Sequence, residues 1–294
     1  MKSPKKPASN CLTNKLVTTV KTFLETATSK FQATGIQTAR LDALILLEDA
    51  TGKDRTWLLA HPEFVLSESA ITLLQTQIER RAKHEPLAYI RGKSEFYGRS
   101  FMVSNETLVP RPETETIITL LRDVVGSWKS KVETITIVDV GTGSGCLAVT
   151  AKLEFPQAIV IATDISSACL KIANQNAKNL GAEVTFYQGD LLQPLPNTKY
   201  QIPNTVLANL PYVPNNYAIN QAATHEPAEA IFGGSDGLNL YRRLFDQIKQ
   251  LKRPPQHILT ESLPFQHQTV QHMAKLHNYK LYKSSDFIQL FCRY

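Results

Sequence analysis

The segment Val138-Asp139-Val140-Gly141-Thr142-Gly143-Ser144-Gly145-Cys146 carries the strongest structural signal in this chain. An apolar, β-branched run over residues 135–138 leads into it, and an apolar run over 146–153 follows it. This pattern predicts a strand, a glycine-rich turn and a helix. Glycines let the backbone pass close to a ligand, and the start of a helix presents free N–H groups to polar ligand atoms.

An acidic residue, Asp164, stands at the end of the next apolar run, residues 158–163. A carboxylate at the end of the second strand of a βαβ unit can bind two ribose hydroxyls. The strand, the glycine turn and this acid together predict a nucleoside site. The alternative is a tight turn followed by an aspartate that caps a helix or lies at the surface.

Composition limits the class of protein. The 294 residues suggest one large or two moderate domains, the 43% hydrophobic content suffices for a packed core, and no stretch is long enough to span a membrane. The net charge of +6 is mild and spread along the chain. Such a charge fits a partner associated with nucleic acid but does not indicate nucleic-acid binding.

Cysteine spacing and the first residues bear on compartment. The cysteines Cys11, Cys146, Cys169 and Cys292 show neither metal-site spacing nor a disulfide framework. We therefore expect no metal and a cytoplasmic protein. Residues 1–6 are basic but lack the apolar region of a signal peptide, so we interpret them as a disordered leader.

Three regions follow one another along the chain. Residues 1–90 show helical periodicity, with Leu41, Leu44 and Ile45 expected to face inward. They predict a helical bundle that either grips a macromolecular substrate or is purely structural. Residues 91–111 are rich in glycine and aromatic residues and predict a hairpin linker. Residues 112–294 alternate between strand and helix patterns after a first helix that runs to about Trp128.

The third region predicts an α/β fold. Strands are expected at 135–140, 158–164, 184–189, 204–208, 257–261, 279–284 and 287–292, and helices at 145–154, 167–180, 237–252 and 264–276. Alternating strands and helices imply a mostly parallel, Rossmann-like sheet of seven strands with helices on both faces. The last two strands almost meet, which favours an antiparallel hairpin at the sheet edge.

The segment Asn209-Leu210-Pro211-Tyr212 directly follows the fourth predicted strand. Ligands of open α/β sheets bind outside the carboxyl ends of the strands. The Asn209 side-chain oxygen and a neighbouring backbone carbonyl can accept the two hydrogens of a planar NH2 group, while Tyr212 stacks on its plane. These residues predict a site for an amide or an exocyclic amine. The alternative is a plain turn with a packed tyrosine.

These motifs resemble known ones. Residues 139–145 resemble the first motif of class I S-adenosylmethionine-dependent methyltransferases, and residues 209–212 resemble the (D/N)PPY motif of methyltransferases that act on planar nitrogen. More narrowly, the chain resembles the PrmC/HemK family of peptide chain release factor glutamine methyltransferases. The matching stretches lie at 39–43, 85–90, 109–115 and 233–238, together with Glu226-Pro227, and so cover both domains.

The resemblance implies a cofactor, S-adenosylmethionine, and a protein substrate, the Gly-Gly-Gln loop of release factors. It implies that the methionine part of the cofactor contacts the glycine turn, its ribose contacts Asp164, and its adenine lies near Asp190 and Leu191. The substrate amide would contact the segment 209–212, with Asn209 also bordering the cofactor. The implied site residues are Gly141, Thr142, Gly143, Ser144, Gly145, Asp164, Asp190, Leu191, Asn209, Leu210, Pro211 and Tyr212.

The chain departs from the family's pattern in two places, and the first, in the segment 209–212, keeps alternatives open. Leu210 replaces the usual proline, although it keeps the backbone carbonyl and the extended bias of a residue before proline. Asn-Leu-Pro-Tyr also resembles the motif of ribosomal-RNA adenine N6-methyltransferases, which would bind RNA or DNA in a strongly salt-dependent way. A non-catalytic cofactor-binding module is a third hypothesis. We expect a monomer without stable binding to nucleic acid or membrane.

The second departure lies near the C-terminus. Residues 261–266, Glu-Ser-Leu-Pro-Phe-Gln, differ from the family's usual Glu-Ile-Gly-x-x-Gln. This difference concerns the local loop and leaves the predicted fold unchanged.

Overall fold

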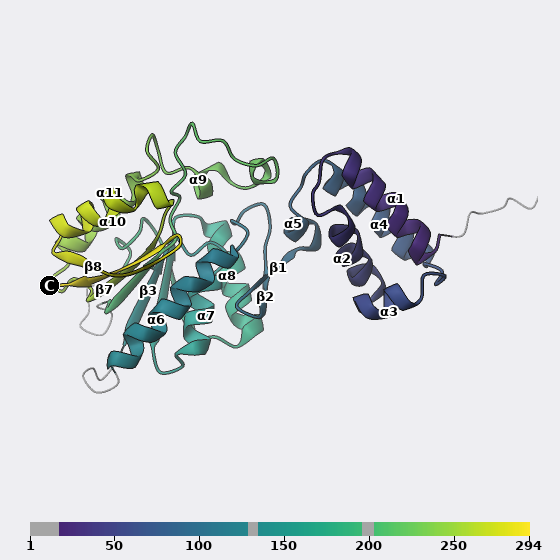
Figure 1. Cartoon of the computed structure of the whole chain (residues 1–294). Helices are drawn as coiled ribbons and strands as arrows, with labels where there is room; N and C mark the ends of the chain where they lie inside the picture. Colours follow the sequence, from purple (N-terminus) through teal and green to yellow (C-terminus); the bar gives the residue numbers. More distant parts are fainter. Residues whose placement is uncertain (1–17, 129–134, 196–202) are drawn as a thin grey trace, which may run out of the picture. The chain divides into compact units, whose positions relative to one another are not determined.

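The computed structural model describes residues 18–128, 135–195 and 203–294 (Figure 1). The chain divides into two compact units, Met1–Leu87 and Ala88–Tyr294, each of which is described by itself. The predicted leader and Cys11 lie outside the described residues. In the part of the chain that is described, no helix is both long and apolar enough to cross a membrane.

The first unit is a helical bundle of α1 (Val20–Ala33), α2 (Ala39–Thr51), α3 (Arg55–Ala60) and α4 (Glu68–Ala82). The side chain of Ser67 caps α4 by accepting a hydrogen bond from the Ala70 N–H, and Gly52 ends α2 in the left-handed conformation. The core of the unit includes large apolar side chains from all four of these helices: Phe23, Leu24, Phe31, Leu46, Leu47, Leu58 and Leu74.

The prediction that Leu41 faces inward is wrong, since its side chain is 43% exposed. Ala39, Ala43, Leu46 and Leu47 form the buried face of α2, and Leu41 lies on the opposite side of the same helix. The buried face also contains Asp42, whose carboxylate pairs with Arg81 at 2.7 Å. Because an ion pair occupies part of this face, hydrophobicity alone does not identify it.

A short helix, α5 (Leu87–Arg91), spans the boundary between the units and was not predicted. The hairpin of β1 (Lys93–Phe96) and β2 (Arg99–Met102) follows it and belongs to the second unit. Tyr97 and Gly98 form its turn, both with the positive φ that two-residue hairpin turns require. The chain then passes through a 3-10 turn, η1 (Pro112–Thr114), into α6 (Glu115–Trp128).

The second unit contains the predicted seven-stranded sheet. Its strands are β3 (Thr136–Val140), β4 (Ile159–Asp164), β5 (Val184–Gln188), β6 (Thr205–Ala208), β7 (His257–Glu261), β8 (Tyr279–Ser285) and β9 (Ile288–Arg293). Their spatial order is β5-β4-β3-β6-β7-β9-β8. The first five run parallel, and β9 pairs antiparallel with both β7 and β8, which confirms the predicted fold class.

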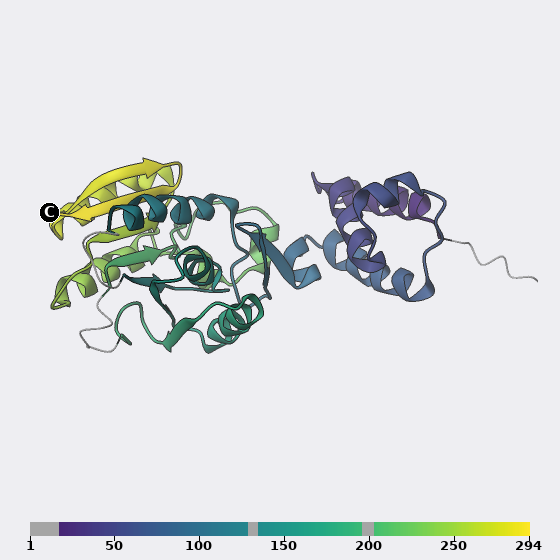
Figure 2. The ribbon, with the colours of Figure 1, turned by 90° about the horizontal axis from the view of Figure 1, so that it is seen from below.

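Helices cover both faces of this sheet (Figures 1 and 2). One core cluster joins α6, α7 (Cys146–Glu154) and α8 (Ser167–Leu180) to side chains such as Ile137 and Leu207. The other joins α10 (Asn239–Gln250) and α11 (His267–Leu276) to side chains such as Val138 and Val206. Successive strand residues thus point to opposite cores, as in a sheet buried on both sides.

The remaining elements are short turns of helix. They are η2 (Ala222–His225), α9 (Ala228–Ile231) and η3 (Pro264–Gln266). The first two lie in the long connection between β6 and α10, and the third leads directly into α11.

Candidate active site

The glycine turn joins β3 to α7. Gly141, Gly143 and Gly145 all have positive φ, which other residues adopt only with strain. A Cβ on Gly141 would lie 2.9 Å from the Leu210 side chain, and one on Gly145 would lie 2.9 Å from the Ala173 Cβ. Gly145 therefore permits close packing of the start of α7 against α8, whereas Gly141 allows close approach of the segment after β6.

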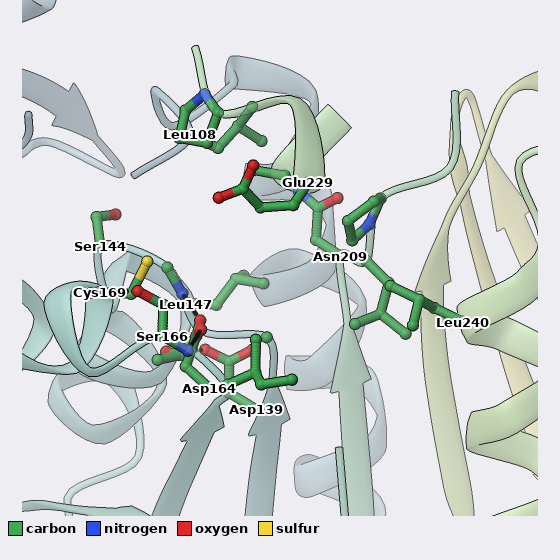
Figure 3. Close-up of a pocket in the computed structure, with 18 of the residues that line it drawn as sticks. Leu108, Asp139, Ser144, Leu147, Asp164, Ser166, Cys169, Asn209, Glu229 and Leu240 are labelled. Atoms are coloured by element: carbon green, nitrogen blue, oxygen red, sulfur yellow. Dashed lines mark hydrogen bonds between the residues drawn. The ribbon is translucent and has the colours of Figure 1, made fainter. Parts of the chain in front are cut away.

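Two carboxylates lie beneath this turn, at the ends of adjacent strands (Figure 3). Asp139 Oδ2 accepts hydrogen bonds from the Thr142 hydroxyl (2.6 Å) and the Ala148 N–H (3.2 Å). Asp164 accepts one backbone N–H on each oxygen, from Gly143 and from Ser166, both at 2.9 Å. Each Asp164 oxygen retains acceptor capacity, which a pair of neighbouring hydroxyls could use.

Burial raises the pKa of both carboxyl groups. Asp139 is 1% exposed, and its pKa rises to about 7 against the opposing effect of its two hydrogen bonds. The pKa of Asp164 is also raised by burial, while its bonds to backbone N–H groups act in the opposite direction. Low solvent exposure is therefore the dominant influence on both groups.

A cavity opens at this end of the sheet. Figure 3 shows Asp139 and Asp164 on one side of it and Asn209 on the other. Of the predicted site residues, those that line it are Gly141, Thr142, Gly143, Ser144, Asp164, Asp190, Leu191, Asn209, Leu210 and Pro211. Gly145 does not line it. Tyr212 lines a neighbouring cavity, and Asn209 and Leu210 border both.

The residues after β5 form one wall of the first cavity. Asp190 accepts a hydrogen bond from Gln247 Nε2 (3.0 Å) and pairs with Arg243 at 2.5 Å. Leu191 has a φ of 52°, a left-handed conformation that costs a non-glycine residue about 1 kcal/mol or more. Backbone strain of this kind concentrates at ligand sites.

A chain of hydrogen bonds lies behind Asn209. Its side-chain nitrogen donates to Thr114 Oγ1 (3.0 Å), and that hydroxyl donates to Glu261 Oε2 (2.7 Å). The Tyr212 hydroxyl donates to Glu261 Oε1 (3.0 Å). Burial raises the pKa of Glu261 to about 7, and burial together with this carboxylate raises the pKa of Tyr212.

Sequence reasoning assigned no function to Thr114 or Glu261. Both lie in the stretches compared with the family, residues 109–115 and 261–266, and this was the available signal.

The glycines of the stretch 233–238 lie against the backbone of the segment 209–212. A Cβ on Gly233 would lie 2.3 Å from the Pro211 carbonyl oxygen, and one on Gly237 would lie 2.0 Å from that of Tyr212. Gln266 Nε2 donates to the Tyr212 carbonyl at 2.7 Å. These contacts fix the backbone around Asn209 and explain why side chains larger than hydrogen do not fit at either glycine.

Arg111 lines both cavities, at the end of the stretch leading into η1. Its guanidinium pairs with Glu226 at 2.6 Å, and the other Glu226 oxygen accepts the Val109 N–H at 3.0 Å. The Glu226 side chain is 2% exposed, so this pair anchors the stretch before η1 to the segment preceding α9.

Comparison with known proteins identifies the family. Residues 22–92 match the PrmC N-terminal domain, and residues 131–288 match a methyltransferase domain. The release factor glutamine methyltransferase of Bacillus subtilis (strain 168) is 39% identical over 70% of this chain and 72% of its own length. That of Moorella thermoacetica (strain ATCC 39073 / JCM 9320) is 37% identical over 87% and 90%, respectively.

Solved structures agree at the level of the fold. The hMettl16 catalytic domain, in complex with a 3′UTR hairpin, superposes with a TM-score of 0.51 at 15% sequence identity, covering 77% of this chain and 82% of that one. Identity this low shows a shared fold and nothing about substrate. The sequence relatives, in contrast, identify the family: the chain belongs to the release factor glutamine methyltransferase family.

Proposed function

We propose that the protein transfers a methyl group from S-adenosylmethionine to the side-chain amide nitrogen of a glutamine in peptide chain release factors. The observation that carries this proposal is the position of Asn209. It lies where the cavity beside Asp164 meets the cavity beside Tyr212, and its amide nitrogen is already bound by Thr114. The amide oxygen is then the group that meets a substrate.

The residues around the first cavity fit the proposed cofactor. Both Asp164 oxygens can accept further hydrogen bonds, here from the ribose hydroxyls. By accepting the Gly143 N–H, the same carboxylate also holds the backbone of the glycine turn in place. Asp190 is fixed by Gln247 and Arg243 and would lie near the adenine, together with Leu191. The turn from Gly141 to Ser144 would contact the methionine part, with Gly145 setting the packing behind it.

When bound, S-adenosylmethionine supplies an electrophilic methyl group. The protein's own contribution is alignment and local electrostatics. Asn209 Oδ1 and the Leu210 carbonyl would each accept one hydrogen of the glutamine NH2 group, and the Tyr212 ring would lie against the amide plane. These contacts favour the positive charge that develops on the nitrogen and hold it in line for attack.

The proposal extends to partners and place of action. Release factors are the proposed protein substrate, and the mild, spread charge supports a protein that forms no stable complex with nucleic acid. We also propose that the protein acts as a monomer in the cytoplasm without membrane binding.

The experiment is a transfer assay with S-adenosylmethionine labelled in its methyl group. Purified release factor and ribosomal RNA are offered separately to the wild-type protein and to Asn209→Ala. We expect label on the release factor glutamine, no label on RNA, and a loss of about 10²-fold or more in Asn209→Ala, as for removal of one preorganised electrostatic contact. Labelled adenine in the RNA, with unlabelled release factor, would establish the N6-methyltransferase alternative instead.

A further inference from the structure

We infer that Thr114, oriented by Glu261, is a positioning residue that determines which end of the Asn209 amide faces the substrate. This inference rests on the proposed function, since it gives a physical reason why the site accepts an NH2 group.

The fold brings these three residues together from distant parts of the chain. Strands β6 and β7 pair in parallel with Ala208 opposite Thr260, so Asn209 and Glu261 follow at the same edge of the sheet. Thr114 ends the 3-10 turn η1 and is 1% exposed. Its hydroxyl lies between the two, 3.0 Å from the Asn209 nitrogen and 2.7 Å from the Glu261 oxygen.

The number of hydrogens determines the direction of this chain of bonds. A threonine hydroxyl has one hydrogen. When Glu261 is ionised its carboxylate can only accept, so Thr114 donates this hydrogen to it. The hydroxyl oxygen can then only accept from Asn209, so the amide must turn its NH2 group toward Thr114. Asn209 Oδ1 consequently points away from Thr114 and serves as the acceptor for a substrate NH2 group.

Glu261 orients both sides of the substrate site. Its second oxygen accepts the Tyr212 hydroxyl at 3.0 Å, so one carboxylate orients both the Asn209 amide and the Tyr212 ring. The Glu261 side chain is buried, and its backbone carbonyl accepts a hydrogen bond from the buried Tyr241 hydroxyl. The backbone of Glu261 is held by Tyr241, and its carboxylate cannot turn away from Thr114 without also losing the bond to the Tyr212 hydroxyl.

Without the Thr114 hydroxyl, the Asn209 amide could turn over. Its NH2 group would then face the NH2 group of the substrate, donor against donor, and the site would lose its preference for amides. A purely structural role for Thr114 predicts something else, namely a loss of stability with an unchanged role for Asn209.

The test is a double-mutant cycle between Thr114→Val and Asn209→Ala, with methyl transfer to release factor as the readout. Thr114→Val keeps the shape of the side chain and removes the hydroxyl. We expect kcat to fall about tenfold in an otherwise wild-type chain, as for loss of one hydrogen bond, with unchanged affinity for S-adenosylhomocysteine. In the Asn209→Ala background the same change should have less than about a twofold effect. Thr114→Ser, which keeps the hydroxyl, is the matched control and should stay near wild type.

A second measurement reads the Asn209 amide directly and needs no substrate. The side-chain NH2 signal of Asn209 is assigned in an NMR spectrum by its absence from Asn209→Ala. We expect its hydrogens to exchange slowly in the wild type and in Thr114→Ser, and at least tenfold faster in Thr114→Val and Thr114→Ala. Equal exchange in all four proteins, or equal losses of kcat in both backgrounds of the cycle, would overturn the inference. Absence of methyl transfer by the wild type with these exchange differences intact would instead contradict the proposed function.

Discussion

At the scale of single residues, burial of the Asp139 carboxyl beside the cavity makes the stability of the folded protein depend on pH. Its carboxyl is buried below the glycine turn and its pKa is raised from 3.8 to about 7. Between these values the folded protein holds a proton that the unfolded chain releases. Stability therefore falls as pH rises from about 4 to 7, by about 1.4 kcal/mol for each unit of pKa difference.

Asp139→Asn should remove this pH dependence. Both hydrogen bonds to Asp139 end on the same oxygen, Oδ2, so an amide oxygen in that place can accept both and the side chain stays neutral. We measure the urea concentration at the midpoint of unfolding. We expect the value for the variant to increase relative to that of the wild type as pH rises from 4.5 to 7.5. Asp123→Asn, at the exposed pair with Lys283, is the control. A difference between Asp139→Asn and wild type that stays constant across this range would contradict the prediction.

Residues of the site differ in how well the sequence predicts them. Asp164 and Asn209 could be found because Asp164 ends one apolar strand and Asn209 directly follows another, and the carboxyl ends of parallel strands meet at one edge. Glu261 also ends an apolar strand, β7, whereas Thr114 lies in a 3-10 turn, and the bond between these two residues could not be predicted in this way. Their bond joins positions that are far apart in the chain, and neither residue type by itself indicates a buried relay.

At the scale of elements, long helices and strands were predicted well because their apolar periodicity is strong and glycine or capping residues mark their ends. Helix α8 matches its predicted bounds, 167–180, since Ser166 caps it and Gly181 ends it. The short helices α5 and α9 were missed because a single turn has no measurable period. On α2, Leu44 is buried as predicted, but Leu41 was misjudged because the buried pair of Asp42 and Arg81 occupies part of the inward face.

The hairpin and the glycine turn are linked through one side chain of α8. Asn176 accepts the Met102 N–H at 2.7 Å and donates to the carbonyls of Met102 (2.9 Å) and Ser144 (2.8 Å). Asn176 therefore bonds the backbone groups of Met102 that a neighbouring strand would otherwise bond, and it also holds the glycine turn at Ser144. Its side chain is 1% exposed, so no water can replace these bonds easily.

Asn176→Asp should loosen both segments at once. The substitution keeps the size of the side chain but removes the two donated hydrogens, leaving carboxylate oxygen facing two carbonyls. We expect a loss of about 2–4 kcal/mol in the free energy of unfolding. Hydrogen exchange should rise in peptides covering 93–102 and 141–146, with α10 unchanged. Asn174→Ala, on the exposed side of the same helix, is the control; protection of residues 93–102 that survives Asn176→Asp would show that the link is not needed.

At the scale of the whole molecule, we expect the two units to have different roles, with the pocket in the second and substrate recognition in the first. Both core clusters of the second unit draw only on residues from Phe96 onward, so this unit has a complete core of its own. All residues that line the two cavities also belong to it. Like the second unit, the first unit exposes apolar side chains that a protein substrate could contact: Leu41, Leu59, Val65 and Leu73.

A chain reduced to residues 86–294 should therefore keep α5, the hairpin and both cavities, and lose recognition of the intact substrate. We expect its affinity for S-adenosylhomocysteine, measured by calorimetry, to stay within about threefold of the full chain, because no side chain of the pocket is removed. Methyl transfer to a short Gly-Gly-Gln peptide should be similar in both proteins. Transfer to intact release factor should fall at least tenfold, through a higher KM, because the additional contact surface is lost. If the shortened chain modified intact release factor as fast as the full chain, substrate selection would have to reside in the second unit, around the cavity that Tyr212 lines.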